Sequence, residues 1–250
     1  FKGVAISQVL PEAMVSERVD VPTIANLNQY GMAADRDPFA RTAFSAEVHD
    51  RTVPFQSPYL SHVMQIEDHA QRGSEELPHL IGGYKTQAAY PSTPIGKSLA
   101  LAAQIIGSNI GTRVLYVSHG SFDTHVNQVA TQNNLLQQLS DAMSAFYTDL
   151  AAHGNDKRVL ALTFSEFGRR IEENGARGTD HGEASPLFMI GGGVKGGVYG
   201  SNPDLSNTNM GNVKFSTDFR SVYATVLERW LGRPSAAVLG GTFSKLPVLT

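Results

Sequence analysis

Residues 113–164, RVLYVSHGSFDTHVNQVATQNNLLQQLSDAMSAFYTDLAAHGNDKRVLALTF, decide the fold class. Two short apolar runs rich in branched side chains, Arg113–Ser118 and Arg158–Phe164, have the length and composition of buried strands. Between them, Asn127–His153 carries apolar residues three or four positions apart and is followed by Gly154, as in a long amphipathic helix. A strand, a long helix and a second strand predict an α/β fold with a mostly parallel sheet and helices on its faces.

The flanking sequence extends the same pattern. Pro94 predicts the start of another helix, and Pro186–Ile190 predicts a third strand. A final helix is expected to begin at a Ser216 or Thr217 cap and to end at Gly232. Residues 32–90 are more polar and irregular, with one helix expected at about 58–71, so we interpret them as an insertion-like region within a single domain over 1–250.

Composition excludes several classes of protein. A hydrophobic fraction of 41% is enough for a substantial core in a chain of 250 residues. The net charge of −3 and the lack of a basic block make nucleic acid an unexpected partner. No apolar run approaches the roughly 20 residues of a membrane helix, so no membrane span is expected. The chain has no cysteine, which excludes disulfides and thiolate metal sites.

Acidic and imidazole side chains follow or precede the predicted strands. Asp123 and His125 come after the first strand, Glu166 comes after the second, and Asp180 and His181 lie in the expected loop before the third. Because ligands gather at the carboxyl ends of parallel strands, these groups are expected to converge. Oxygen and imidazole ligands without thiolate suit a divalent metal, which we expect to be Zn²⁺, Mn²⁺ or Mg²⁺.

Simpler interpretations stay open for single residues. Asp123 has the residue type that caps a helix or turn, and it precedes the long helix. His119 and Asn127 flank the cluster in the sequence. They are candidates to support the metal ligands by hydrogen bonds without contacting the metal themselves. The same supporting role is a candidate for Asp218 and Arg220, although helix-terminal electrostatics explain them equally well and a buried Arg220–carboxylate pair is a further alternative.

Three long motifs carry a family resemblance: GSFDTHVNQ, TFSEFGRRIEENGARGTDHGEASPLFMIGGGVKGGVYG and TDFRSVYATVLERWLG. They resemble the bacterial domain-of-unknown-function family 1501, and the similarity covers nearly the whole chain. That family is grouped with the alkaline-phosphatase-like superfamily, which includes sulfatases and phosphopentomutases. The resemblance implies a three-layer sandwich. It also implies export to the periplasm, because many members carry a twin-arginine signal.

The superfamily resemblance can be followed residue by residue. GTDHGEASPLF is similar to the segment around the last metal histidine of phosphopentomutase-like members, which makes His181 a metal candidate. Asp123 with His125 resembles their Asp-plus-His pair for the same metal, at a shorter spacing. Glu166 lies where the superfamily has the Asp of an Asp-His-Gly motif after a strand.

The chain departs from the superfamily in three ways. Phe167 stands where the Asp-His-Gly motif has its metal-binding His. The superfamily's first strand, with a metal Asp and the Ser or Thr nucleophile, is expected before Phe1. The remaining loops offer no clear nucleophile. The second metal site is therefore expected to be depleted.

These observations lead to three hypotheses. The first is a metal-dependent hydrolase of phosphate or sulfate esters, with Glu166 as a second-site ligand or general base and Arg169 or Arg170 holding a small anionic substrate. The second is a catalytically inactive exported binding protein on the same fold, which holds an anion, a glycan or a protein partner. In the third, the chain is an incomplete module whose open sheet edge pairs with a partner chain.

Overall fold

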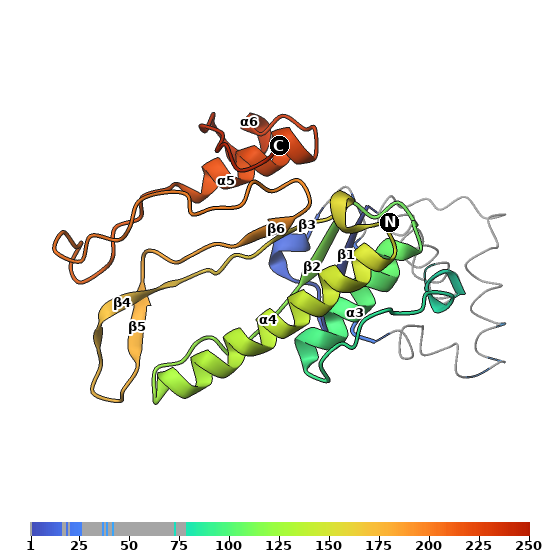
Figure 1. Cartoon of the computed structure of the whole chain (residues 1–250), viewed down its shortest axis with the longest axis horizontal. Coiled ribbons are helices and arrows are strands. Elements are labelled where there is room, and N and C mark those ends of the chain that lie inside the picture. Colours follow the sequence, from blue (N-terminus) through green and yellow to red (C-terminus); the bar gives the residue numbers. More distant parts are fainter. Residues whose placement is uncertain are drawn as a thin grey trace, which may run out of the picture. The chain divides into compact units, whose positions relative to one another are not determined.

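The computed structural model (Figure 1) describes residues 2–16, 19, 21–26, 37, 39, 42, 73 and 79–250. Most of the insertion-like region 32–90, including the helix expected at 58–71, lies outside these residues. The chain forms two compact units. Unit 1 comprises Phe1–His119 and Gln138–His153, and unit 2 comprises Gly120–Gln137 and Gly154–Thr250. A single domain over 1–250 stays a prediction.

Helices and strands alternate along the described part of the chain. Their order is β1 Gly3–Ile6, η1 Glu12–Met14, α3 Pro94–Gly107, β2 Val114–Val117, α4 Gln128–Ala152, η4 Asp156–Arg158, β3 Leu160–Leu162, β4 Gly168–Glu173, β5 Thr179–Gly182, β6 Met189–Gly191, α5 Phe219–Thr225, η5 Val226–Trp230 and α6 Ala236–Leu239.

Unit 1 is built on a parallel strand pair. β1 pairs with β2 in the register Gly3↔Val114 to Ile6↔Val117, and Val4 and Ala5 in β1 are fully buried. Helix α3, which packs on both strands, begins where Thr93 accepts a hydrogen bond from the Gly96 N–H at 3.3 Å. The strand predicted at 113–118 and the helix predicted from Pro94 are confirmed.

Helix α4 confirms the long helix predicted at 127–153. Its buried apolar residues recur at helical spacing and include Leu135, Phe146 and Leu150. Leu136, which the sequence pattern placed in the same stripe, is 43% exposed, so the buried stripe is narrower than expected. The helix begins in unit 2 and ends in unit 1.

A buried carboxylate anchors the segment before α3 to the end of α4. Asp149 is fully buried, and its two oxygens accept hydrogen bonds from the Gln87 N–H at 2.6 Å and the Tyr90 hydroxyl at 3.0 Å. Burial, followed by the hydrogen bond and negative charge of Asp149, raises the pKa of Tyr90 well above its usual range. His153 also faces this carboxylate, at 3.4 Å, and stacks on Tyr84.

Unit 2 contains two antiparallel pairs. β3 pairs with β6, and β4 pairs with β5 as a hairpin that brings Arg169 opposite His181. The third strand is therefore Met189–Gly191 rather than Pro186–Ile190. Asp180 and His181 were expected in a loop but lie in β5. The chain can turn back here because Asn174 bonds the backbone N–H groups of the following turn.

The final helix is capped one or two residues later than expected. The Asp218 side chain, rather than that of Ser216 or Thr217, accepts a hydrogen bond from the Arg220 N–H at 2.8 Å. α5 continues directly into the π-helical turn η5. The chain then turns at Gly232, whose φ of 63° is the left-handed conformation that glycine adopts most easily. The stop predicted at Gly232 is confirmed.

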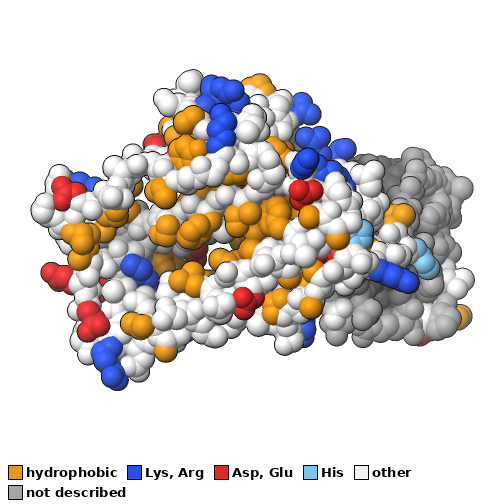
Figure 2. All heavy atoms as spheres, viewed as in Figure 1, with side chains coloured by type: hydrophobic (Ala, Val, Ile, Leu, Met, Phe, Trp, Pro, Cys, Tyr) orange, Lys and Arg blue, Asp and Glu red, His pale blue; other side chains and the backbone are white. Residues whose placement is uncertain are grey.

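The structure is therefore mixed α/β with small sheets, namely one parallel pair and two antiparallel pairs among the described residues. A mostly parallel sheet was expected, but two of the three strand pairs in the described residues are antiparallel, and the three-layer sandwich stays a prediction. None of the helices in the described ranges is long and apolar enough to cross a membrane. Some apolar side chains remain open to solvent (Figure 2), and Phe164 and Phe188 of unit 2 are each 51% exposed.

Candidate metal centre

The candidate site lies within unit 2, between the hairpin β4–β5 and the loop that precedes α4. The backbone N–H groups of Asn127 and Gln128 donate to the carbonyl groups of Ala176 and Arg177, both at 3.0 Å. The turn of the hairpin thus supplies hydrogen-bond acceptors to the first N–H groups of α4, where a helix lacks internal partners. This docking holds the loop against β5.

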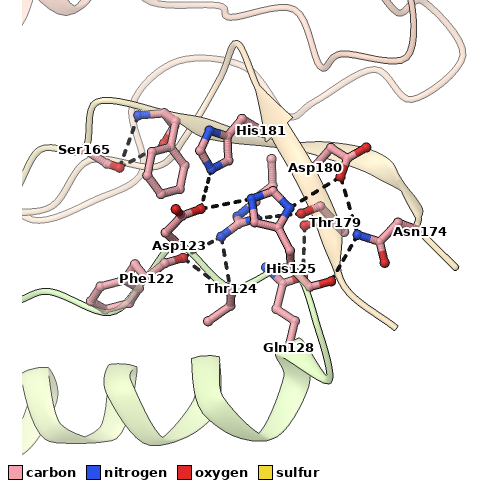
Figure 3. Close-up of polar contacts among 12 residues, drawn as sticks. Phe122, Asp123, Thr124, His125, Gln128, Ser165, Asn174, Thr179, Asp180 and His181 are labelled. Carbon is pink, nitrogen blue, oxygen red and sulfur yellow. Dashed lines mark hydrogen bonds and ion pairs between the residues drawn. The ribbon is translucent and has the colours of Figure 1, made fainter. Parts of the chain in front are cut away.

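Three of the predicted ligands converge across this junction (Figure 3). Oδ1 of Asp123 lies 2.6 Å from Nε2 of His181 and 3.0 Å from Nε2 of His125. The three donor atoms all lie within 4.8 Å of one another. Asp123 is therefore directed at two imidazoles rather than at the start of α4. All three side chains are at least 40% exposed, so solvent and small molecules can reach them.

The donor set fits a divalent ion. Bonds of about 2.0–2.2 Å in tetrahedral geometry place neighbouring ligand atoms roughly 3.3 Å apart. The observed spacings of 2.6 Å and 3.0 Å are shorter than that value, and the two imidazole nitrogens lie within 4.8 Å of each other, so the side chains would shift to bind an ion. Two imidazole nitrogens and one carboxylate oxygen suit Zn²⁺ and other transition metals better than Mg²⁺, which prefers oxygen. Three protein ligands would leave a coordination position open.

Interactions with the two histidines favour the ionised form of the Asp123 carboxylate, which is the form that binds a metal. The hydrogen bond with His181 lowers the pKa of Asp123 below its usual range, and the charges of His181 and His125 act in the same direction. Asp123 therefore stays ionised at neutral pH. Metal binding requires no loss of a proton from this residue.

Asp180, another predicted ligand, lies on the other side of the His125 ring (Figure 3). Its Oδ1 is 3.4 Å from Nδ1 of His125, whereas Nε2 of the same ring faces Asp123. It does not belong to the group of three converging donors. Its carboxylate thus contacts the candidate ligand His125 rather than the point that the three donors share.

Asn174 organises this side of the site and was not predicted from the sequence. Its Nδ2 donates to the His125 carbonyl at 3.1 Å and to Asp180 at 3.4 Å. Its Oδ1 accepts from the N–H groups of Ala176 and Gly178. The Asn-Gly pair at 174–175 signals a hairpin and could have indicated this residue, although the strands are joined by the longer loop 174–178, in which Arg177 has the positive φ.

Arg169 joins the loop to the hairpin. One terminal nitrogen donates to the Thr179 carbonyl at 2.6 Å, and the other donates to the Phe122 carbonyl and to the Thr124 hydroxyl at 3.3 Å. Both terminal nitrogens are thus engaged by the chain itself. The predicted role of Arg169 in holding an anionic substrate stays a prediction.

Phe167 covers one face of a candidate ligand. Its ring stacks on His181 with centroids 3.9 Å apart and an interplanar angle of 5°. The Arg169 guanidinium lies 5.1 Å from the centre of the same phenyl ring. Phe167, which stands where the superfamily motif has a histidine, therefore acts here as an apolar support for His181.

Gly178 allows the hairpin to approach the loop closely. A Cβ atom at this position would lie 2.2 Å from the carbonyl oxygen of His125. Any other residue would push the backbone of His125 away from β5. The two pieces of chain can meet at this distance only with glycine.

The remaining predicted residues are not among the three converging donors. Glu166 is exposed in the turn after β3, and it is not part of the group. His119 belongs to unit 1, two residues after β2. Asn127 adopts a φ of 45° beside α4 and bonds to the hairpin through its backbone.

Asp218 and Arg220 pair with each other at 2.7 Å. Their side chains are 29% and 48% exposed, so the alternative of a buried pair is wrong. The helix-terminal interpretation is confirmed, because Asp218 caps α5.

The two units and the three converging donors define an α/β protein with a candidate metal-binding site. The family model described as "Protein of unknown function (DUF1501)" matches residues 4–235, and the chain belongs to this family. No curated protein and no solved structure matches the chain significantly.

Proposed function

We propose that this protein is a metal-dependent hydrolase of phosphate or sulfate esters. The observation that carries the proposal is the convergence of Asp123, His125 and His181 within 4.8 Å of one another. Their exposure supports a catalytic rather than a structural site, because a structural zinc site is closed by four protein ligands.

Each residue has a defined task in this proposal. Asp123, His125 and His181 would hold the ion, which supplies Lewis-acid polarisation of the ester oxygen and charge neutralisation when bound. Phe167 keeps the His181 ring in place through its stacking contact. Glu166, exposed beside this support, is proposed as the general base that takes a proton from the attacking water. Arg170 is the candidate for binding the substrate anion, since Arg169 donates to the chain.

Metal analysis and a substrate screen test the proposal directly. The purified protein is assayed for bound metal and for turnover of aryl phosphate and aryl sulfate esters with added Zn²⁺, Mn²⁺ or Mg²⁺. His181→Ala is expected to abolish both metal binding and turnover. His79→Ala, which changes an exposed histidine of unit 1, serves as the control. A wild-type protein that binds none of these ions and turns over no ester would eliminate the hydrolase.

The alternative is a catalytically inactive binding protein that uses the same site for an anion, a glycan or a protein partner. It is supported by Phe167 at a position expected to hold a ligand and by the engagement of Arg169 with backbone carbonyl groups. In this case the wild-type protein binds an anion such as phosphate, and His181→Ala weakens that binding. Multiple turnover by the wild type would exclude the alternative.

We also propose the alkaline-phosphatase-like three-layer fold. The parallel pair β1–β2, flanked by α3 and followed by α4, supports it. Export to the periplasm rests on the family resemblance and is tested by cell fractionation. A partner chain at an open sheet edge is tested by size-exclusion chromatography, in which a well-behaved monomer would count against it.

A further inference from the structure

We propose that Asp180 is a positioning residue that sets which nitrogen of His125 faces the metal. Its carboxylate would accept the proton on Nδ1, so that the lone pair of Nε2 is directed at the ion. This inference rests on the proposed metal site. It assigns to Asp180 a role different from that of the ligand that the sequence predicted.

The orientation of the His125 ring supports this role. Its Nε2 lies 3.0 Å from Asp123 Oδ1, on the side shared with His181, and its Nδ1 lies 3.4 Å from Asp180 Oδ1. A neutral imidazole carries a proton on one nitrogen and a lone pair on the other. When Nε2 binds an ion, Nδ1 must therefore carry the proton, and Asp180 is placed to accept it.

Asp180 is itself held in place. Asn174 Nδ2 donates to the Asp180 carboxylate at 3.4 Å and to the backbone carbonyl of His125 at 3.1 Å. One amide thus links the backbone of His125 to the carboxylate that faces its ring (Figure 3). Asp180 also precedes His181 in β5, so one short strand carries a ligand and the group that orients another.

A carboxylate behind a metal-binding imidazole fixes its tautomer and raises its basicity. Loss of such a group typically weakens metal binding by about 10–100-fold. Asp180 faces the ring nitrogen opposite the converging donors at 3.4 Å, and a small side-chain shift would bring it into ordinary hydrogen-bond distance. The expected effect of its removal is therefore on metal affinity and tautomer, with the three ligands still present.

The test is a zinc titration of the full chain with a chelator competition readout. Asp180→Ala is expected to raise the Kd for zinc about 10–100-fold, and the isosteric Asp180→Asn, which retains an acceptor, is expected to raise it less. Glu183→Gln is the matched control, because this nearby carboxylate accepts a hydrogen bond from Asn209 at 2.8 Å. Circular dichroism confirms that each variant is folded.

A second measurement needs no variant. In the zinc-loaded wild type, ¹⁵N-resolved NMR of the imidazoles is expected to show His125 with a proton on Nδ1 and zinc on Nε2. A proton on Nε2 would overturn the inference, as would an unchanged Kd in Asp180→Ala when the wild type binds zinc. A wild type that binds no zinc would instead overturn the metal site itself, so the two failures are distinguishable.

Discussion

Replacement of Arg169 by alanine tests how the site is assembled. The side chain donates to the carbonyl groups of Thr179 in the hairpin and Phe122 in the loop. A hydrogen bond from a charged group contributes about 1.5–3 kcal/mol, and partial exposure favours the lower end of that range. Two such bonds therefore stabilise the docked loop by roughly 3 kcal/mol.

Other contacts limit the effect. The backbone bonds of Asn127 and Gln128 to the hairpin remain in the variant and keep part of the loop docked. Since 1.4 kcal/mol corresponds to a factor of ten, about 3 kcal/mol sets an upper limit of roughly 100-fold, and with part of the loop still docked we expect the Kd for zinc to rise about tenfold. Arg169→Lys is expected to recover only part of the loss, because one ammonium cannot reproduce the fork of a guanidinium.

The assay combines zinc titration with amide hydrogen exchange. Faster exchange at Asn127 and Gln128 reports undocking of the loop, since their N–H groups donate to Ala176 and Arg177. Arg229→Ala, which changes an exposed arginine of unit 2 outside the site, is the control for the loss of a positive charge. Unchanged zinc affinity together with unchanged exchange in Arg169→Ala would refute the reasoning.

Four other outcomes are expected. Glu166→Gln should lower kcat for an ester substrate about 100-fold or more if Glu166 is the general base, with zinc affinity retained. Gly178→Ala should weaken zinc binding, because a Cβ would meet the His125 carbonyl at 2.2 Å; titration of the variant checks this. Asp149→Ala should lower the free energy of unfolding by about 1–3 kcal/mol in urea titrations, since it removes the acceptor of two part-buried hydrogen bonds. The raised pKa of Tyr90 means that folding keeps a proton that the unfolded chain loses, so stability should fall as pH rises above about 10, and less so in Tyr90→Phe.

The sequence predicted the elements with strong periodicity. α3, α4 and β2 were expected within a residue or two of their bounds, because their apolar patterns and caps are local signals. The approach of Asp123 to His181, 58 positions apart, was also expected from strand ends and family resemblance. Both kinds of feature were predicted from sequence patterns that can be recognised without knowing how side chains are oriented.

The supporting residues could not be predicted in the same way. Successive side chains of a strand point to opposite faces, so the register of β5 decides where the Asp180 carboxylate lies. It could have faced the ion, but it faces Nδ1 of His125. Arg169 donates hydrogen bonds to backbone carbonyl groups. The positions of such groups cannot be inferred from residue types. In the sequence, Asp149 cannot be distinguished from the other polar residues of the helix. Its burial is explained by hydrogen bonds from Gln87 and Tyr90, which are distant in sequence.

The distance along the chain between the donors has a consequence for the cell. An ion bound by both Asp123 and His181 would crosslink residues 58 positions apart. Such a crosslink would lower the conformational entropy of the unfolded chain. During metal starvation the protein would open more often and would be degraded by proteases. Its abundance in a culture would then follow zinc supply.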